Sequence, residues 1–450
     1  KAKLMRIHFI AIGGSAMHNL AIALHRKGNR VTGSDDAIYE PSRSRLEKEG
    51  LLPQSFDWDA SRIDASIDAI ILGMHAKADN PELLAAKALS LTVYSYPEYL
   101  YEATKEKTRV VIGGSHGKTS ITAMILHVLD YWDLSVDYMV GAQLEGFDIM
   151  THLTEDNDFV VLEGDEYLSS AIDRRPKFHL YKPNIALISG IAWDHVNVFP
   201  TKADYVEQFK LFIETMKAGG ILIYNQEDEI LEELVASTQH PIRKIPYQTH
   251  SYNVDNGQTQ LESEEGPIPL QIFGQHNMSN LSGALLVCTQ MGIEPVMFYE
   301  AIPSFCGASK RLELFADRPE KRIYRDFAHA PSKVQATTQA VREQFPNDLF
   351  LACLELHTFS SLETSFIHTY ANCLTHTDIA VVFIDDEARK AKGKNPLDED
   401  TIRNAFSHQS LYVFYDKETL SDWLQQQPAS IILMMSSGHF GGLDLYSLVD

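Results

Sequence analysis

The chain has 450 residues, of which 44% are hydrophobic and 22% are charged, the composition of an ordinary globular protein. At roughly 150 residues per domain, this length predicts about three domains. A net charge of −22 disfavours nucleic-acid binding, which requires a basic stripe, and no apolar run approaches the ~20 residues of a membrane span. The one basic cluster, Arg389 to Lys394, lies in a stretch with glycine and proline and is expected to be a solvated loop face.

The cysteines and the amino-terminal sequence indicate the cellular compartment of the protein. None of the four cysteines has a metal-like spacing, so we expect reduced core residues of a cytosolic protein. No targeting segment is visible, because the first apolar run, Ile7–Ile12, is too short and contains His8. We therefore expect a cytoplasmic protein with no nucleic-acid or membrane partner. The sequence does not indicate its oligomeric state. The cysteines are Cys288, Cys306, Cys353 and Cys373.

Residues 1–106 form the first predicted domain, a Rossmann-like α/β unit whose alternating elements imply a parallel sheet. At the end of its first strand, Ala11-Ile12-Gly13-Gly14-Ser15-Ala16 fits the G-x-G-x-x-G pattern only as A-x-G-x-x-A. Asp35 follows the second strand, near the ~20-residue offset of an acidic ribose contact. The turn predicts nucleotide binding, with a dinucleotide among the candidate ligands, and a plain tight turn is the alternative. The predicted strands are Ile7–Ile12, Asn29–Thr32, Ala69–Gly73 and Leu91–Tyr94.

Residues 107–304 form the predicted central domain, a P-loop ATPase-like α/β unit with a loop typical of phosphate binding. The strand Val110–Ile112 runs into Gly113-Gly114-Ser115-His116-Gly117-Lys118-Thr119-Ser120, and a helix follows. Glycines let backbone amides point at a phosphate, the helix N-terminus adds positive partial charge, and Lys118 and Thr119 can reach phosphates and Mg²⁺. The full Walker pattern would need glycine at Ile112, so this is a shortened variant. A chance Gly-Lys-Thr in a surface turn is the alternative.

Two strand ends in the central domain carry candidate metal ligands. The predicted strand Phe159–Leu162 ends in Glu163-Gly164-Asp165-Glu166, where a Mg²⁺ ligand beside a phosphate loop would sit. The stretch Ile185–Ile191 leads to Asp194-His195, which could bind a second cation or hold the site. A further strand is predicted at 221–224, a β-hairpin or loop at Gln248–Pro267, and a closing helix at Asn277–Met291.

Residues 305–450 form the third predicted domain, again Rossmann-like. One strand ends in Asp326, and Phe327-Ala328-His329 precedes Pro331, which could open a helix. Earlier, His276-Asn277-x-x-Asn280 lies at or within a helix. Taken alone, each motif is more typical of structure than of function. The predicted strands are Arg322–Tyr324, Leu349–Leu354, Ile379–Phe383, Leu411–Phe414 and Ile431–Met435.

Taken together, these motifs resemble the Mur ligase family of peptidoglycan synthesis over nearly the whole chain. The loop at 113–120 is similar to the family's short phosphate loop, Glu163–Glu166 to its Mg²⁺ motif and Asp194-His195 to its Asp-His motif. Three further stretches are similar to its adenine-side motif and its third-domain ATP contacts: Gly274–Asn280, Lys310–Glu313 and Asp326–His329.

The resemblance implies an ATP- and Mg²⁺-dependent ligase that makes an amide bond through an acyl phosphate. Lys118, Glu163 and His195 would be catalytic, and Thr119, Glu163 and His195 would bind metal. The implied ATP contacts are Gly114, Ser115, His116, Gly117, Lys118, Thr119, Ser120, Asn277, Asn280, Arg311, Asp326 and His329. The implied contacts to a UDP-linked sugar are Gly13, Gly14, Ser15, Ala16, Ser34, Asp35 and His75.

Two activities of the family take UDP-N-acetylmuramate, and one adds L-alanine. The other adds the tripeptide L-alanyl-γ-D-glutamyl-meso-diaminopimelate, and the resemblance is greater to this one. The stretches that favour it are Gly164–Tyr167, Asp173–Phe178, Leu354-Glu355 and Ser437–Gly442. The L-alanine ligase is the rival, and Leu356–Ser361 departs from both.

Three other interpretations stay open. A nicotinamide dehydrogenase built on Gly13 and Asp35 would leave Lys118, Glu163 and His195 without a role. A non-catalytic sensor would bind ATP and form no amide. Lys210 is either a carbamoylated, metal-bridging lysine, as in some relatives, or an ordinary helical surface residue.

Overall fold

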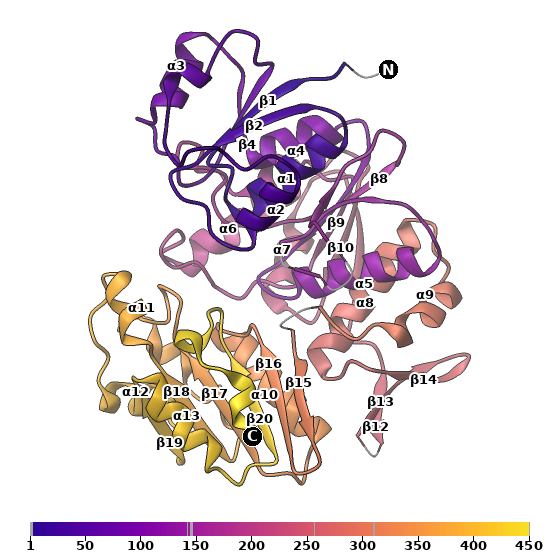
Figure 1. Cartoon of the computed structure of the whole chain (residues 1–450). Helices are drawn as coiled ribbons and strands as arrows, with labels where there is room; N and C mark the ends of the chain where they lie inside the picture. Colours follow the sequence, from indigo (N-terminus) through magenta and orange to yellow (C-terminus); the bar gives the residue numbers. More distant parts are fainter. Residues whose placement is uncertain (1–2, 142, 145–146, 256, 309–310, 450) are drawn as a thin grey trace. The chain divides into compact units, whose positions relative to one another are not determined.

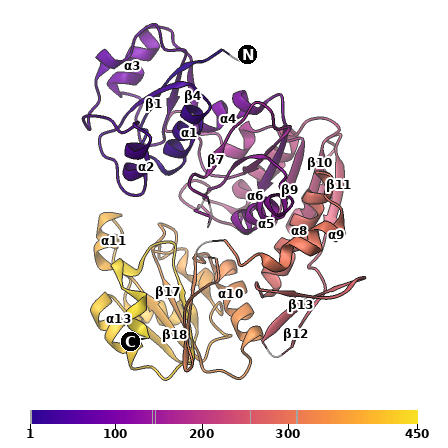
Figure 2. The same ribbon diagram turned by 45° about the vertical axis from the view of Figure 1, so that its right-hand side comes forward.

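The structure is a computed structural model that describes residues 3–141, 143–144, 147–255, 257–308 and 311–449. The chain forms two compact units, each described by itself below (Figures 1 and 2). The first comprises Lys1–Ile191 and Val206–Tyr247, and the second comprises Ala192–Tyr205 and Gln248–Asp450. Three largely parallel sheets confirm the predicted α/β class. The domain boundaries at 106/107 and 304/305 stay predictions.

A four-stranded parallel sheet of order β2-β1-β3-β4 opens the first unit. Its strands are short and mostly buried, as expected for a sheet covered on both faces. The strands are β1 (Arg6–Ile10), β2 (Arg30–Ser34), β3 (Ala69–Leu72) and β4 (Val93–Ser95). The helices are α1 (Ser15–Arg26), α2 (Ser42–Lys48), η1 (Ala60–Arg62), α3 (Pro81–Ala88) and α4 (Tyr96–Thr104).

The second sheet of this unit has seven strands in the order β11-β10-β9-β5-β8-β6-β7, all parallel except β7. Strand β5 lies between β9 and β8, so the loop after β5 is flanked by two other strand ends. The strands are β5 (Thr108–Gly113), β6 (Asp137–Met139), β7 (Thr151–His152), β8 (Phe159–Glu163), β9 (Ile185–Ile188), β10 (Ile221–Asn225) and β11 (Arg243–Tyr247). The helices are α5 (Lys118–Tyr131), η2 (Lys177–Leu180), α6 (Lys202–Thr215) and α7 (Glu229–Ser237). The residues of α6 up to Tyr205 are counted with the second unit.

The second unit contains a small antiparallel sheet where a hairpin or loop was predicted. Its strands are β12 (Tyr252–Asp255), β13 (Gln258–Ser263) and β14 (Gly266–Leu270). The helices α8 (Gln275–Gln290), α9 (Pro295–Ala301) and η3 (Ile302–Ser304) follow. The predicted helix Asn277–Met291 is therefore confirmed to within two residues at its start.

A six-stranded sheet of order β15-β16-β20-β17-β18-β19 completes this unit, with only β15 antiparallel to its neighbour. Helices α10 and α12 bury apolar side chains on one face and α13 on the other. The strands are β15 (Glu313–Arg318), β16 (Lys321–Asp326), β17 (Phe350–Glu355), β18 (Ile379–Phe383), β19 (Leu411–Phe414) and β20 (Ile431–Met435). The helices are α10 (Pro331–Gln344), η4 (Ile367–Tyr370), α11 (Asp386–Ala391), α12 (Glu399–Phe406), α13 (Lys417–Gln425), η5 (Phe440–Gly442) and η6 (Leu445–Leu448).

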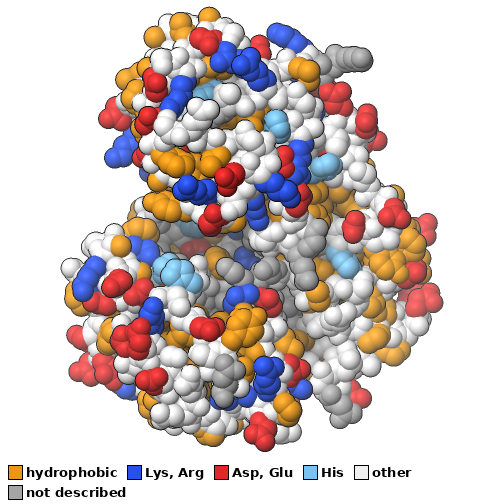
Figure 3. Space-filling view, in the orientation of Figure 1, with side chains coloured by type: hydrophobic (Ala, Val, Ile, Leu, Met, Phe, Trp, Pro, Cys, Tyr) orange, Lys and Arg blue, Asp and Glu red, His pale blue; other side chains and the backbone are white. Residues whose placement is uncertain are grey.

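Two expectations are corrected. Cys306 is exposed, whereas the other three cysteines are buried as expected. The basic cluster begins inside α11 rather than in a loop, because the Arg389 guanidinium is buried against Asp386 one turn earlier. On the face drawn in Figure 3, basic side chains are interspersed with acidic ones. No helix in the described part of the chain is long and apolar enough to cross a membrane.

A buried arginine fixes the end of α4 to the seven-stranded sheet. Arg109, 1% exposed, donates from Nε to the carbonyl of Tyr181 at 2.8 Å and from Nη2 to that of Lys182 at 2.9 Å. Its Nη1 donates to the carbonyls of Lys105 at 2.9 Å and Lys107 at 3.0 Å, just beyond α4. A cation suits the negative end of a helix, and here it satisfies carbonyls that would otherwise be orphaned.

We predict that Arg109→Met lowers the free energy of unfolding by about 2–4 kcal/mol, because several buried carbonyls lose their donor at once. Urea denaturation followed by circular dichroism measures the change. Arg318→Met, at an exposed arginine with one long carbonyl contact, is the control and should stay within about 0.5 kcal/mol. Equal stability of the Arg109 variant and this control would contradict the capping role.

Candidate active site

The loop after β5 has the backbone that phosphate binding needs. Gly114 has φ +128° and Gly117 has φ +82°, in the region that favours glycine. A Cβ at Gly114 would lie 2.0 Å from the Ser189 hydroxyl oxygen, so only glycine fits beside β9. The Ser115 amide donates to the Gly190 carbonyl at 3.0 Å and ties the loop to the end of that strand. Gly117 is the N-cap of α5 and has no side chain, so the first amides of the helix can face an anion.

Lys118, the first residue of α5, lies among acidic side chains. Its Nζ donates to Glu166 Oε2 at 2.8 Å and to the Gly114 carbonyl at 2.6 Å. Burial lowers the pKa of Lys118, but the charges of Glu166 and Asp165 outweigh it, and the net shift is upward. The ammonium is therefore charged at neutral pH, as a phosphate ligand must be.

Thr119 and Glu163 meet at the point where β5 and β8 end. The Thr119 hydroxyl donates to Glu163 Oε1 at 2.9 Å, and the Gly141 amide donates to Oε2 at 2.8 Å. Glu163 is 8% exposed and Thr119 is 4% exposed. A hydroxyl and a carboxylate at this distance offer the hard oxygen ligands that Mg²⁺ prefers, so the predicted metal-binding pair fits the ion.

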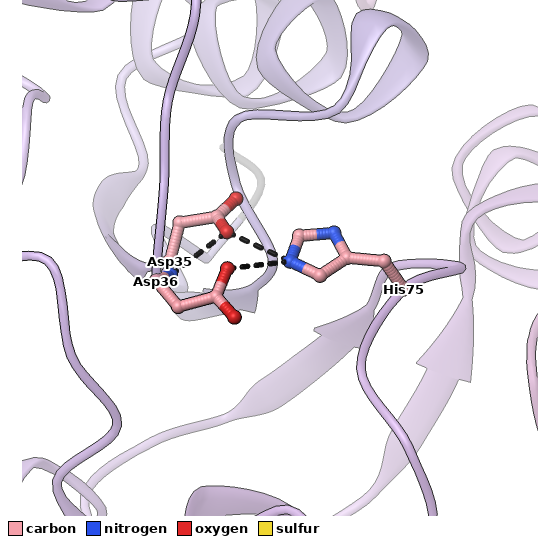
Figure 4. A group of neighbouring side chains, drawn as sticks. All are labelled: Asp35, Asp36 and His75. Atoms are coloured by element: carbon pink, nitrogen blue, oxygen red, sulfur yellow. Dashed lines mark hydrogen bonds and ion pairs between the residues drawn. The ribbon is translucent and has the colours of Figure 1, made fainter. Parts of the chain in front are cut away.

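The glycine turn after β1 is organised by acidic residues after β2. The Gly13 amide donates to Asp35 Oδ2 at 2.8 Å, and a Cβ on Gly13 would lie 2.9 Å from the same oxygen. His75 Nε2 lies 2.8 Å from Asp35 Oδ1 and 3.2 Å from Asp36 Oδ1 (Figure 4). Burial raises the pKa of Asp35 against the opposing effects of Gly13 and His75. Three of the predicted sugar-nucleotide contacts thus lie together.

The other predicted contacts to the UDP-linked sugar differ in their exposure to solvent. Gly14 precedes Ser15 and Ala16, which are exposed in the first turn of α1. Ser34 is fully buried at the end of β2, and its hydroxyl donates to Glu82 Oε1 on helix α3 at 2.8 Å. Its side chain supports the turn from within the domain.

In the second unit, the Asp-His motif lies beside residues that follow β16. Lys333 Nζ is 3.7 Å from Asp194 Oδ2, and the Trp193 indole packs edge-on against Phe366 at 6.3 Å between ring centroids. Burial and then Lys333 lower the pKa of His329 to about 3, so its ring is neutral near pH 7. His195 belongs to this second unit, and its role in binding a second cation stays a prediction.

Asp326 organises the predicted third-domain nucleotide contacts. Its Oδ1 accepts from the Leu312 amide at 2.6 Å, and its Oδ2 accepts from the Thr337 hydroxyl at 2.9 Å. The Arg311 guanidinium stacks 4.5 Å from the centre of the Phe327 ring. Asn277 and Asn280 are buried on α8, and Asn277 donates to the Phe273 carbonyl at 2.9 Å. Lys310 lies outside the described residues.

Two domains of one protein family match the chain by sequence. One, described as the Mur ligase family catalytic domain, matches residues 6–108, and the other, the Mur ligase middle domain, matches residues 112–288. The chain belongs to the Mur ligase family. Together the two matches cover the glycine turn, the phosphate loop, Glu163 and the Asp-His motif.

Curated Mur ligases resemble the chain along its length. It is 29% identical to the UDP-N-acetylmuramate–L-alanyl-γ-D-glutamyl-meso-2,6-diaminoheptandioate ligase of Escherichia coli K12, over 98% of this chain and 96% of that one. It is 29% identical to the UDP-N-acetylmuramate–L-alanine ligase of Caldicellulosiruptor bescii, over 83% of this chain and 82% of that one. The solved UDP-N-acetylmuramate–alanine ligase of Thermotoga maritima, 20% identical, superposes with a TM-score of 0.72 over 99% of this chain and 97% of that one, which shows the shared fold.

Some residues of this Mur ligase site could not be assigned from sequence. Glu166 was visible in the acidic motif, but nothing in the sequence indicated that it pairs with Lys118. Gly141 contributes only a backbone amide to Glu163, from a segment with no motif. Lys177 pairs with Asp165 at 3.0 Å from twelve positions away.

We predict that Gly114→Ala abolishes measurable ATP binding while the fold survives, because the added Cβ would collide with Ser189. Isothermal titration with Mg²⁺ and a non-hydrolysable ATP analogue measures affinity, and circular dichroism checks the fold. The matched control is Gly219→Ala, at a glycine with φ +78° and nothing within 4 Å of its Cβ position. If Gly114→Ala and Gly219→Ala bind equally, the loop does not hold the phosphates.

Proposed function

We propose that the chain is an ATP-dependent ligase that joins the lactyl carboxylate of UDP-N-acetylmuramate to the amine of L-alanyl-γ-D-glutamyl-meso-diaminopimelate. The observation that best supports an ATP-dependent reaction is that Lys118, Thr119 and Glu163 lie together around the loop after β5. The Escherichia coli relative, which matches along almost the whole of both chains, supports the choice of substrates. The reaction belongs to peptidoglycan recycling, and we place it in the cytoplasm.

The proposed chemistry has two steps. The lactyl carboxylate attacks the γ-phosphorus of ATP, giving an acyl phosphate and ADP, while Lys118 neutralises charge on the phosphoryl oxygens. The amine then attacks the acyl carbon, loses a proton and expels inorganic phosphate. Thr119 and Glu163 would hold Mg²⁺, which supplies positive charge to the phosphates, and His195 would hold a second ion.

The remaining predicted contacts fit substrate positioning. The glycine turn at Gly13 and Gly14, with Asp35 and His75, would bind the UDP-linked sugar near an exposed helix start. Ser115, His116 and Ser120 would complete the phosphate contacts of ATP. The predicted contacts from the second unit are Asn277, Asn280, Arg311, Asp326 and His329. Closure of the third domain over ATP would exclude water, which hydrolyses acyl phosphates.

The L-alanine ligase is the second candidate. The Caldicellulosiruptor bescii enzyme is as similar per residue but matches a smaller share of the chain, which favours the tripeptide. If the chain were a dehydrogenase or a non-catalytic sensor, Lys118, Thr119 and Glu163 would have no catalytic role.

Phosphate release from ATP, measured with Mg²⁺ and UDP-N-acetylmuramate, tests the choice of amine. We expect release that requires the tripeptide, with at least a tenfold lower rate when L-alanine replaces it at equal concentration, about 1.4 kcal/mol of discrimination. Release that depends on L-alanine instead would establish the second candidate. Phosphate release that requires neither the tripeptide nor L-alanine would contradict both ligase activities.

A further inference from the structure

The ammonium of Lys118 is held by a carboxylate that the proposed chemistry does not use. Glu166 Oε2 accepts from Lys118 Nζ at 2.8 Å, and the side chains are 0% and 15% exposed respectively. The second bond of the ammonium, to the Gly114 carbonyl at 2.6 Å, draws it back over its own loop. Lys118 is therefore already paired in the place where the phosphates of ATP are expected.

Neighbouring carboxylates have other partners. Glu163 accepts from the Thr119 hydroxyl and the Gly141 amide at 2.9 and 2.8 Å. Asp165 pairs with Lys177 at 3.0 Å. Glu166 is thus the carboxylate in direct contact with the Lys118 ammonium.

This pairing has a consequence for nucleotide binding. A lysine in such a loop reaches the β- and γ-phosphates, and its three N–H donors can serve only a few acceptors at once. A phosphate that takes Lys118 must displace or share the Glu166 carboxylate, and separating a buried ion pair costs free energy.

We propose that Glu166 is a positioning residue that holds the Lys118 ammonium before nucleotide binds and competes with the β- and γ-phosphates of the nucleotide for it. The inference rests on the proposed function, because it takes the loop as the ATP site. In this role Glu166 limits the affinity of the ATP site for nucleotide.

The sign of the effect distinguishes competition from a purely structural role. Glu166→Gln keeps the shape and one acceptor oxygen but removes the charge, so Lys118 is released more readily. Affinity for ADP and for β,γ-methylene-ATP should rise by roughly threefold to tenfold. A residue that only maintained the loop would weaken binding when replaced.

Isothermal titration of the full chain at fixed Mg²⁺, with a melting curve for each variant, measures this. AMP is the internal control, because it lacks both phosphates and its affinity should not change. Asp165→Asn is the matched control, because it removes the same charge one residue away from a carboxylate paired with Lys177. Glu166→Asp, which keeps the charge on a shorter arm, should fall between the wild type and Glu166→Gln, and it provides the test if the glutamine variant unfolds.

Unchanged or weaker ADP binding by Glu166→Gln would overturn the inference, and so would equal tightening by Asp165→Asn or for AMP. If these results came with intact tripeptide ligation, the proposed function would stand and only the competition would fail. A wild-type chain that binds neither ADP nor the analogue would instead contradict the ATP site itself, and with it both proposals.

Discussion

The parallel register between β5 and β8 is the constraint on which the phosphate site depends. Pairing Ile112 with Glu163 brings the end of β8 level with the start of the glycine loop. Because side chains alternate along a strand, a slip of one residue would turn Glu163 to the opposite face. Only in the observed register can the Thr119 hydroxyl meet the Glu163 carboxylate at 2.9 Å. The metal-binding pair is therefore a product of the sheet rather than of either loop alone.

The same geometry recurs in the four-stranded sheet. Ile10 pairs with Ser34, so the turn after β1 and the acidic residues after β2 emerge side by side. Asp35 then fixes the Gly13 amide, and His75 joins from the end of β3. In a chain of net charge −22, anionic substrates would be repelled by most of the surface. Backbone amides and a few positively charged side chains at the strand ends are the groups that can attract an anion.

Motifs with a local physical cause were predicted well from the sequence. Buried apolar runs marked most strands of the parallel sheets, and Pro331 marked the start of α10. The strands β6, β7, β11 and β15 were not predicted. The glycines of the phosphate loop were visible because their conformation demands that residue. What could not be predicted depends on partners distant along the chain. The Lys118–Glu166 pair and the Gly141 amide are set by the packing of β8 and its neighbours, and a solvent-facing Cys306 has no signature of its own.

The central claim is that ATP activates a carboxylate as an acyl phosphate, and transfer of isotopic oxygen tests it most directly. UDP-N-acetylmuramate labelled with ¹⁸O in its lactyl carboxylate would be turned over with ATP, Mg²⁺ and the tripeptide, and the inorganic phosphate analysed by mass spectrometry. The account predicts one ¹⁸O atom in each phosphate released, because the oxygen that attacks phosphorus leaves with it. Phosphate free of label, formed alongside ligated product, would contradict the account.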